Sequence, residues 1–387
     1  MKSIPQMAPW FGQEEQQAVA AYLASGGWLT EFARTRTFGE MIATYVGCRH
    51  VVVVNNGTAS LIVALLGLGI GRGDEVLVPD YTMIASANAV ALVGATPMLV
   101  DIDRDTLCLD LKQAEAALTP RTRAMVFVPI NGRGANMDQI VRFCSDHHLL
   151  LVEDAAQALG SRFHGQHLGT FGDIGTLSFS VPKVITTGQG GAVLVNDDEI
   201  YNRVALIKDF GRPRSGVDYH QIVGYNFKFT DLQAVIGIEQ MKKLQWRVER
   251  KKSIYRLYRE QLERVPELEL VATDLMDTSP WFIDILVPAE HRERLIAFLA
   301  DRGIGTRPFY PAIHTQPPYS QVRGDFPVAE TVSRRGLWLP SSSSLTDSEI
   351  NYVCEQVSEY FRGRAWTAVS GHDRANMALS NEERTRG

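Results

Sequence analysis

The stretch VVVVNNGTASLIVALLGLGI, residues 51–70, decides the fold class of this chain. Four consecutive valines are typical of a strand that is buried on both faces, and NNGT ends the run. The pattern ASLIVALLGLGI that follows is helical. A buried strand, a turn and a helix in this order predict the first part of a βαβ unit.

The same alternation continues through the first 200 residues. Further short apolar runs are EVLVP (75–79), PMLVDI (97–102), RAMVFVP (123–129), LLLVEDA (149–155), LSF (177–179) and AVLV (192–195). Helical stretches between them are YTMIASANAVALVGA, LKQAEAAL and MDQIVRFCSDH. We therefore predict an α/β fold, with a large domain whose central sheet is mostly parallel and flanked by helices. Ligands of such sheets bind at the carboxyl ends of the strands.

The pattern changes after residue 231. A charged helical stretch over 231–265 is long enough to bridge two domains, and strands and helices then alternate in the manner of a smaller α+β domain. We predict a large domain over 1–249 and a small C-terminal domain over 250–363. The polar tail 364–387 has no periodicity and is predicted to be disordered.

Composition excludes several classes of protein. The 387 residues are 45% hydrophobic and 21% charged, with a net charge of −5, so neither nucleic acid nor a membrane is an expected partner. The four cysteines are far apart and show no metal-ligand or disulfide spacing, so no metal is expected. The N-terminus lacks an apolar signal-peptide segment and no apolar run is long enough to span a bilayer, which together predict a cytoplasmic protein.

A single lysine stands in SFSVPKVITTGQGG, residues 178–191. Between Asp173 and Asp197, Lys183 is the one ionisable side chain. Burial among apolar groups lowers the pKa of an amine and frees the lone pair needed to form a Schiff base with a carbonyl. The alternative is a lysine that happens to lie on a surface turn.

A carboxylate ends the strand LLLVEDA. Glu153 and Asp154 would lie at the carboxyl end of a central strand, where an acid can bind metal, act as a base, pair with a cationic ring nitrogen, or cap the next helix. Lys183 and Asp154 on neighbouring strand ends form the pair that pyridoxal phosphate requires: the lysine holds its aldehyde and the acid keeps its ring nitrogen protonated.

The third part of this set is a phosphate site. Gly57 permits close approach of the backbone, Thr58 lies where the next helix begins, and Ser178 adds a hydroxyl. The alternative for GTAS is an ordinary capped helix. GLGIGRG (67–73) closes a helix instead of opening one, so we do not interpret it as a dinucleotide site.

Four segments carry a resemblance to a known family: NNGTASL, VEDAAQALGS, GTFGDIGTLSFSVPKVITTGQGGAVLVND and GYNFKFTDLQAVIGIEQM. They resemble the DegT/StrS family of sugar aminotransferases over residues 8–363. The resemblance implies the aspartate-aminotransferase fold, with pyridoxal phosphate as cofactor and its pyridoxamine form during turnover.

The resemblance also implies roles for individual residues. Lys183 would bind the cofactor and later carry a proton, Asp154 would pair with the ring nitrogen, and Gln157 would hydrogen-bond the ring hydroxyl. The residues that would hold the phosphate are Gly57, Thr58 and Ser178. Asn226 would reach the phosphate of the neighbouring subunit's cofactor, which implies a homodimer with shared active sites.

The chain departs from the family at three places. Met83 stands where the family has an aromatic residue on the cofactor ring, with Tyr81 close by in the sequence. VPINGRG (128–134) replaces a family motif and puts substrate contacts near Asn131 and Arg133 in doubt. GGWLTEFAR changes the sequence beside the expected substrate pocket, where we place Trp28.

The segment TRPFYPAIHTQPPYS (306–320) resembles that of perosamine synthases, which aminate a GDP-linked 4-keto-6-deoxymannose with glutamate. We expect Arg307, Tyr310 and His314 to contact a nucleotide-sugar substrate there, or else to form a structural loop. An aminotransferase for another keto sugar or a cyclitol is an alternative, as is a non-catalytic regulatory or binding protein of this fold. Dehydratases of the family carry histidine in place of the lysine, and Lys183 argues against that reaction.

Overall fold

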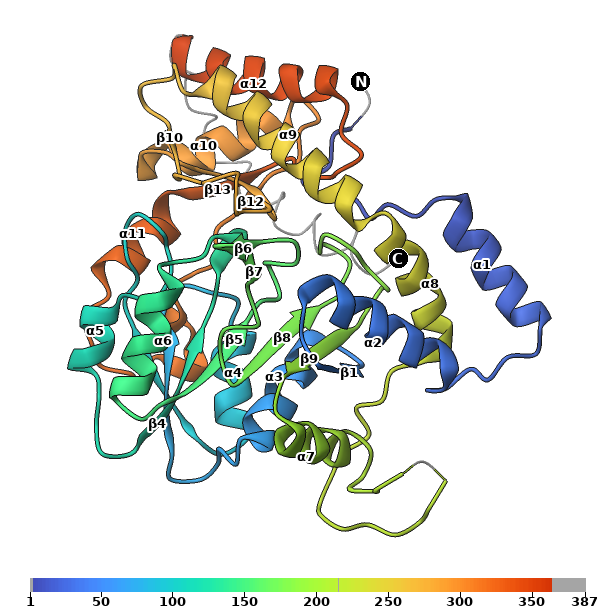
Figure 1. Cartoon of the computed structure of the whole chain (residues 1–387). Coiled ribbons are helices and arrows are strands. Elements are labelled where there is room, and N and C mark those ends of the chain that lie inside the picture. Colours follow the sequence, from blue (N-terminus) through green and yellow to red (C-terminus); the bar gives the residue numbers. More distant parts are fainter. Residues whose placement is uncertain (1–2, 215, 364–387) are drawn as a thin grey trace.

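The computed structural model describes residues 3–214 and 216–363, with a seven-stranded sheet at its centre (Figure 1). Across the sheet the strands are β1 (His50–Val54), β9 (Gly191–Val195), β8 (Ile174–Ser178), β5 (Leu150–Asp154), β4 (Thr122–Phe127), β2 (Glu75–Pro79) and β3 (Thr96–Val100). β9 runs antiparallel to both neighbours and the other pairings are parallel. The predicted mostly parallel sheet is confirmed.

Helices flank this sheet. They are α1 (Gln13–Ala24), α2 (Ala33–Val46), α3 (Gly57–Gly67), α4 (Ala85–Leu92), α5 (Leu111–Ala116), α6 (Met137–Asp146), α7 (Asp198–Lys208) and α8 (Asp231–Lys242). α3 packs on β8 and β9 and is almost entirely buried, which explains why its sequence is apolar on every side. The Asn56 side chain caps α3 by accepting a 2.8 Å hydrogen bond from the Ala59 N–H.

The antiparallel strand β9 brings the carboxyl ends of β1 and β8 together. Gly191 pairs with Val54 on one side and with Ser178 on the other. A Cβ atom on Gly191 would lie 2.4 Å from the Asn56 carbonyl oxygen, so only glycine permits this approach. The turn after β1 therefore lies beside the end of β8.

A second, antiparallel sheet has the order β10 (Glu269–Leu270), β11 (Ile283–Leu286), β13 (Gly336–Leu339) and β12 (Arg307–Pro308). The helices of this part are α9 (Leu244–Leu262), α10 (Ala289–Ala300), α11 (Pro327–Arg335) and α12 (Asp347–Arg362). Side chains of α9, α10, α12 and this sheet form a hydrophobic core of their own. This is the predicted smaller α+β part of the fold.

One predicted helix is two helices in the structure. The stretch 231–265 divides at Lys243 into α8 and α9, so the prediction of a single helix was wrong. α8 packs on α1 and α2, whereas α9 rises to pack on α12 (Figure 1), and one straight helix cannot do both. The Lys243 ammonium lies 2.9 Å from a carboxylate oxygen of Glu15 in α1. The predicted domain boundary at 249/250 falls inside α9 and stays a prediction, and the tail 364–387 lies outside the described residues.

A second difference concerns the stretch 81–95. Its helix, α4, covers only Ala85–Leu92, and the chain bends at Tyr81 and Thr82 before it. No helix in the described ranges is long and apolar enough to cross a membrane. The four cysteines are free thiols.

A buried histidine makes the fold sensitive to acid. His167, in the hairpin of β6 (Arg162–Phe163) and β7 (Gln166–His167), is 0% exposed. Its Nε2 accepts from the Gly160 N–H at 2.9 Å and its Nδ1 lies 2.6 Å from the Leu168 carbonyl oxygen. Burial lowers the pKa of His167 to about 4.

We expect the His167→Gln variant to remove part of the acid sensitivity. Below pH 6.5 the histidine of the unfolded chain binds a proton, whereas that of the folded chain stays neutral until about pH 4. The free energy of unfolding therefore falls by up to ~1.4 kcal/mol per pH unit as the pH falls from about 6.5 to about 4. Urea unfolding from pH 8 to pH 4.5 measures this. The difference in unfolding free energy between wild type and variant should shrink towards low pH, and a constant difference would contradict the assignment.

Candidate active site

Lys183 lies at the tip of the loop that joins β8 to β9. The Thr186 hydroxyl donates to the Phe179 carbonyl and the Thr187 N–H donates to the same oxygen, both at 3.0 Å, which folds the loop back over the end of the sheet. Among the described residues, the Lys183 Nζ has no hydrogen-bond or ion-pair partner, and it lies 4.0 Å from the centre of the Trp281 ring. A loop held this firmly around an amine without a partner is what a covalent attachment point needs.

The surroundings of this amine lower its pKa towards neutral pH. Burial lowers the pKa of Lys183 to about 8, while Asp154 acts to raise it and Arg307 acts to lower it further. Asp154 and Lys183 therefore act on one another although 28 residues separate them in the chain. The predicted pairing of lysine and acid around one site agrees with this geometry.

The two acids at the end of β5 have different roles. Glu153 is fully buried and its carboxylate accepts from the N–H groups of Gly169, Phe171 and Gly172, so it holds a loop. Asp154 points to the other face, as residues alternate along a strand. It is 5% exposed and accepts from the Ser86 hydroxyl at 2.7 Å. Burial raises the pKa of Asp154, and the bond from Ser86 and the charge of Lys183 oppose that rise.

The sequence did not reveal the role of Ser86. It lies in the first turn of α4, 68 residues from its acid partner.

We expect Ser86→Ala to weaken the binding of the cofactor about tenfold, because Asp154 loses a hydrogen bond that favours its charged form, typically worth ~1.5 kcal/mol. Equilibrium titration with pyridoxal phosphate measures this. Thr44→Ala, which removes an exposed hydroxyl of α2, is the matched control. Unchanged affinity in Ser86→Ala would contradict this role.

Gly57 and Ser178 form a cradle at the start of α3. A Cβ atom on Gly57 would lie 2.8 Å from Cβ and 3.0 Å from Oγ of Ser178. Thr58 is the second residue of α3, and its half-buried side chain lies where helical N–H groups are free. A helix N-terminus with two adjacent hydroxyl side chains is a site for a phosphate.

Gln157 is oriented by the segment that follows β4. Its Oε1 accepts from the Asn131 N–H at 2.8 Å, which leaves the amide Nε2 to donate elsewhere. Asn131, in the 3₁₀ turn η1 (Ile130–Gly132), has a left-handed backbone with φ of 54°. Its side chain donates to the Phe282 carbonyl and to Asp284 in β11, so it joins the two sheets.

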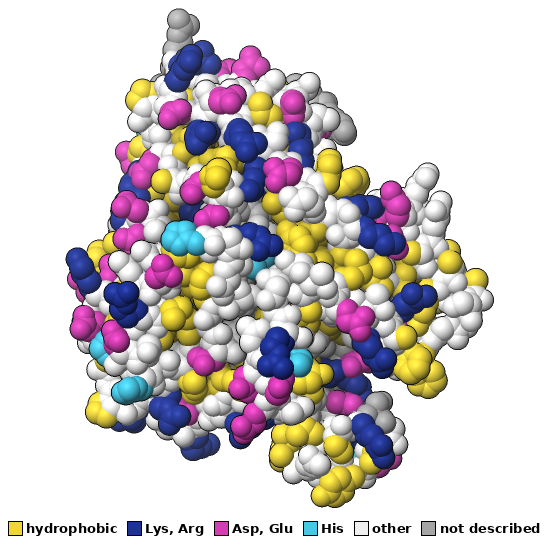
Figure 2. Space-filling model, viewed as in Figure 1, with side chains coloured by type: hydrophobic (Ala, Val, Ile, Leu, Met, Phe, Trp, Pro, Cys, Tyr) yellow, Lys and Arg dark blue, Asp and Glu magenta, His cyan; other side chains and the backbone are white. Residues whose placement is uncertain are grey.

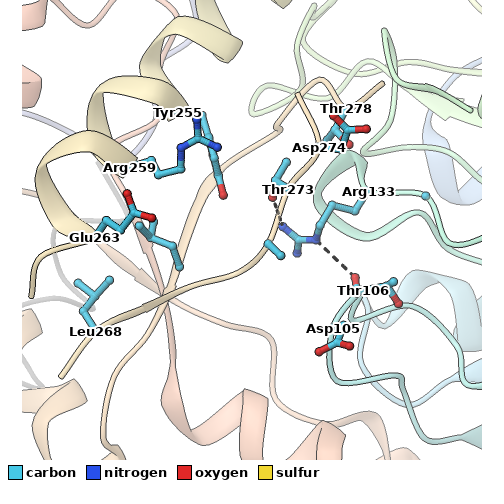
Figure 3. A pocket seen from close by; sticks show the side chains of 13 residues that line it. Asp105, Thr106, Arg133, Tyr255, Arg259, Glu263, Leu268, Thr273, Asp274 and Thr278 are labelled. Carbon is cyan, nitrogen blue, oxygen red and sulfur yellow. Dashed lines mark hydrogen bonds between the residues drawn. The ribbon is translucent and has the colours of Figure 1, made fainter. Parts of the chain in front are cut away.

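Arg133 is also structural. Its guanidinium is 4% exposed and lies 2.6 Å from the Asp284 carboxylate, and it donates to the Thr106 carbonyl and the Thr273 hydroxyl (Figure 3). It forms one wall of a cavity of about 650 Å³ that extends to Arg259 and Glu263 of α9 and does not include Lys183. The segment VPINGRG thus fastens β11 to the large sheet.

Two predicted substrate contacts, Tyr81 and His314, have structural partners in this chain, and their contacts with substrate stay predictions. Tyr81 is 1% exposed, and its ring packs against Phe309 and Tyr310. His314, in η2 (Ile313–Thr315) before η3 (Pro317–Tyr319), has its Nδ1 2.6 Å from buried Asp80 and its ring stacked on Phe326. Both side chains hold the 306–320 segment on the large sheet, Tyr81 through ring packing and His314 through Asp80.

The charge of Arg307 acts on Lys183 and that of Asp154 acts on Tyr310, which places these two predicted residues near the lysine and the acid. The Arg307 side chain is exposed and its guanidinium lies over the rings of Tyr310 and Trp338, at 5.5 and 5.6 Å. Tyr310 is 8% exposed, and burial raises its pKa to about 12. Met83 is 44% exposed and lies three residues before Ser86, the partner of Asp154. Their contacts with ligands stay predictions.

Two more predicted residues lie on the surface. Trp28, between α1 and α2, is 65% exposed. Asn226 is exposed on the projecting segment between α7 and α8 (Figure 1), and only its backbone is paired, with Asp209. The same projecting segment carries exposed Tyr219, Val223 and Tyr225, and Figure 2 shows hydrophobic side chains gathered there. Neither Trp28 nor Asn226 contacts Lys183 within the described single chain.

The residues present fit pyridoxal phosphate. The amine without a partner, the buried acid beside it and the glycine–serine cradle together match the aldehyde, the ring nitrogen and the phosphate of this cofactor. A Cβ atom on Gly57 would collide with Ser178, so the glycine allows the start of α3 to lie against this serine.

Comparisons with known proteins agree with this site. The model of the DegT/DnrJ/EryC1/StrS aminotransferase family matches residues 10–358. The chain is 36% identical over 362 residues to the GDP-perosamine synthase of Escherichia coli O157:H7, covering 93% of this chain and 99% of that protein. It is also 36% identical over 326 residues to the GDP-perosamine synthase of Caulobacter vibrioides, covering 82% and 87%.

A solved structure has the same fold. DesV of S. venezuelae, in complex with a ketimine intermediate, is similar with a TM-score of 0.86 at 33% identity, covering 91% of this chain and 95% of that one. The predicted aspartate-aminotransferase fold and the cofactor are thereby confirmed. The chain belongs to the DegT/DnrJ/EryC1/StrS aminotransferase family of pyridoxal-phosphate-dependent sugar aminotransferases.

Proposed function

We propose that this enzyme transfers an amino group from L-glutamate to a nucleotide-linked 4-keto-6-deoxy sugar, in the manner of GDP-perosamine synthases. The relatives with that name support the class of substrate. The observation that carries the proposal is exposed Arg307, whose charge acts on Lys183. A guanidinium at the mouth of the site suits the carboxylate of glutamate or the diphosphate of a nucleotide sugar.

Each residue of the site has a proposed task. When bound, pyridoxal phosphate supplies an aldehyde and an electron-withdrawing ring that carry the amino group between the two substrates. Gly57, Thr58 and Ser178 hold its phosphate, and Asp154 keeps a proton on its ring nitrogen. Lys183 supplies the amine that anchors it and moves protons at Nζ, for which a pKa of about 8 is suitable near neutral pH.

Gln157 and Met83 complete the cofactor site in this proposal. The free Nε2 of Gln157 is directed to the ring hydroxyl because Asn131 occupies its Oε1. The exposed thioether of Met83 packs on the ring face, since a polarisable sulfur makes favourable contacts with aromatic rings. Arg307 and Tyr310 line the substrate side.

A panel of substrates tests the proposal. Purified enzyme is first treated with L-glutamate, and the loss of the visible absorbance of the bound cofactor reports the uptake of the amino group. Keto sugars are then added one at a time, and recovery of the absorbance identifies the acceptor. We expect recovery with a nucleotide-linked 4-keto-6-deoxy sugar. Recovery only with a free keto sugar or a cyclitol would overturn this substrate, and absorbance indifferent to every amino acid would overturn the transfer.

We also propose a homodimer with shared active sites, and a location in the cytoplasm. Exposed apolar side chains on the segment between α7 and α8, beside Asn226, support an interface there. In this arrangement Asn226 and Trp28 serve the site of the partner subunit. The four free thiols are compatible with a reducing compartment.

Mixing two inactive variants tests the shared site. Lys183→Ala and Asn226→Asp are each expected to be weakly active or inactive, the second because it places a negative charge against the phosphate. A mixed dimer contains one site with both lesions and one intact site, so subunit exchange should restore about one quarter of the wild-type activity. A mixture no more active than its components would contradict the shared site.

A further inference from the structure

Trp281 covers the amino group of Lys183. The Nζ atom lies 4.0 Å from the centre of the indole ring. Trp281 is 2% exposed whereas Lys183 is partly exposed, so the contact is shielded from water on the side of the ring. An ammonium group within about 6 Å of a tryptophan face is attracted by the negative potential of the ring, and the attraction is stronger where water is excluded.

The indole ring is fixed on several sides. Its Nε1 donates to the Pro182 carbonyl at 2.6 Å, which ties it to the residue before the lysine. The backbone carbonyl oxygen of Trp281 accepts a hydrogen bond from the Lys251 Nζ at 2.7 Å. The ring stacks on Phe282 with centres 3.9 Å apart and planes 19° apart. The position of Trp281 is therefore set by the fold and not by Lys183.

Helix α9 braces the other side of the lysine loop. Arg247 Nη1 donates to the Val184 carbonyl at 3.1 Å, and Lys251 lies one turn further along the same face. Both neighbours of Lys183 are thus held through their carbonyl oxygens, Pro182 by Trp281 and Val184 by α9. The backbone of Lys183 is therefore held in place, and only its side chain is free to move.

Four charged groups surround the contact between Lys183 and Trp281. Asp154 and Arg307 act on Lys183 from β5 and β12, and on α9 Arg247 bonds the Val184 carbonyl and Lys251 bonds the Trp281 carbonyl. Three of these four groups are cationic side chains. Within the described ranges no carboxylate lies within ion-pair distance of the Lys183 Nζ, so the ring face is its nearest favourable contact.

We propose that Trp281 is a positioning residue that holds the free ammonium group of Lys183 while the lysine is not attached to the cofactor. The proposal rests on the proposed role of Lys183 as anchor and proton carrier. The ring makes and breaks no bond. It keeps Nζ at one place and favours its protonated form, so that the proton is available at a fixed position.

Competitive labelling of Lys183 tests this directly. The full chain carrying pyridoxamine phosphate, in which the lysine is free, is treated with trace acetic anhydride across a range of pH, and mass spectrometry of the lysine peptide gives the pKa of Lys183. Trp281→Leu is expected to lower this pKa by about one unit, the equivalent of a buried cation–π contact. Trp281→Phe keeps a weaker ring face and is expected to lower it by less.

Fluorinated tryptophan at position 281 separates electrostatics from shape. Fluorine weakens the negative face of the ring and keeps its size and its N–H bond to Pro182, so the pKa of Lys183 should fall stepwise as fluorines are added. The pH dependence of single-turnover amino transfer should shift by the same amount. Trp246→Leu, at an exposed tryptophan of α9, is the control and should leave both values unchanged.

Two results would overturn the proposal. One is a pKa of Lys183 that is the same in wild type, Trp281→Leu and the fluorinated proteins. The other is a loss of activity in Trp281→Leu without a shift of the pH profile, which would show a merely structural role. The labelling experiment measures the pKa of Lys183 directly, so its outcome does not depend on which acceptor sugar the enzyme uses.

Discussion

The Lys183→Ala variant is expected to lose amino transfer, with kcat lower by at least about 10⁴-fold. Proton transfer by a positioned group contributes up to about 10⁴, and the variant also loses the covalent anchor of the cofactor. No neighbour can replace it, because Lys251, the other buried lysine of this region, is held by the Trp281 and Ser341 carbonyls.

A chemical measurement on Lys183→Ala and two further variants check this expectation. Borohydride reduction followed by mass spectrometry should add the mass of the cofactor to the lysine peptide of wild type and to no peptide of the variant. Lys183→Arg should also be inactive, because its side chain keeps the charge but cannot release the proton. Lys242→Ala, at an exposed lysine paired with Glu239, is the control and should retain full activity. Activity within tenfold of wild type in Lys183→Ala would refute the assignment.

The Gly57→Ala variant is expected to bind pyridoxal phosphate about 100-fold more weakly. The new Cβ would lie 2.8 Å from the Cβ of Ser178, so the serine must move and the cradle for the phosphate narrows. Loss of two hydrogen bonds to a charged group costs about 3 kcal/mol, and each 1.4 kcal/mol is tenfold in affinity.

The fold itself should tolerate Gly57→Ala. Alanine is a better helix former than glycine by ~1 kcal/mol, and Gly57 is the first residue of α3. The thermal midpoint of the cofactor-free protein is therefore expected to change little, while equilibrium titration shows weak binding. Gly71→Ala, where the added Cβ would make only an ordinary contact with the Val93 carbonyl, should leave both unchanged. Wild-type affinity in Gly57→Ala would show that the phosphate lies elsewhere.

Local signals explain why much of the site could be predicted. Lys183, Asp154, Gly57 and Ser178 each follow or precede a strand of apolar residues, and the ends of such strands meet at one edge of a sheet. Long-range contacts could not be predicted. Tyr81 and His314, for example, contact residues that are distant in the chain.

The sequence by itself determined the α/β class and the strand ends that carry the lysine, the acid and the phosphate cradle. It also determined the cofactor that these residues hold. Both conclusions were possible because apolar periodicity and glycine positions are local properties. Only the tertiary structure decided that Glu153 holds a loop, that Ser86 supports Asp154, and that Trp281 covers Lys183. Trp281 lies 98 residues from Lys183 in the chain. Such contacts depend on how two sheets and the helix that bridges them pack together, and a local sequence pattern does not report this packing.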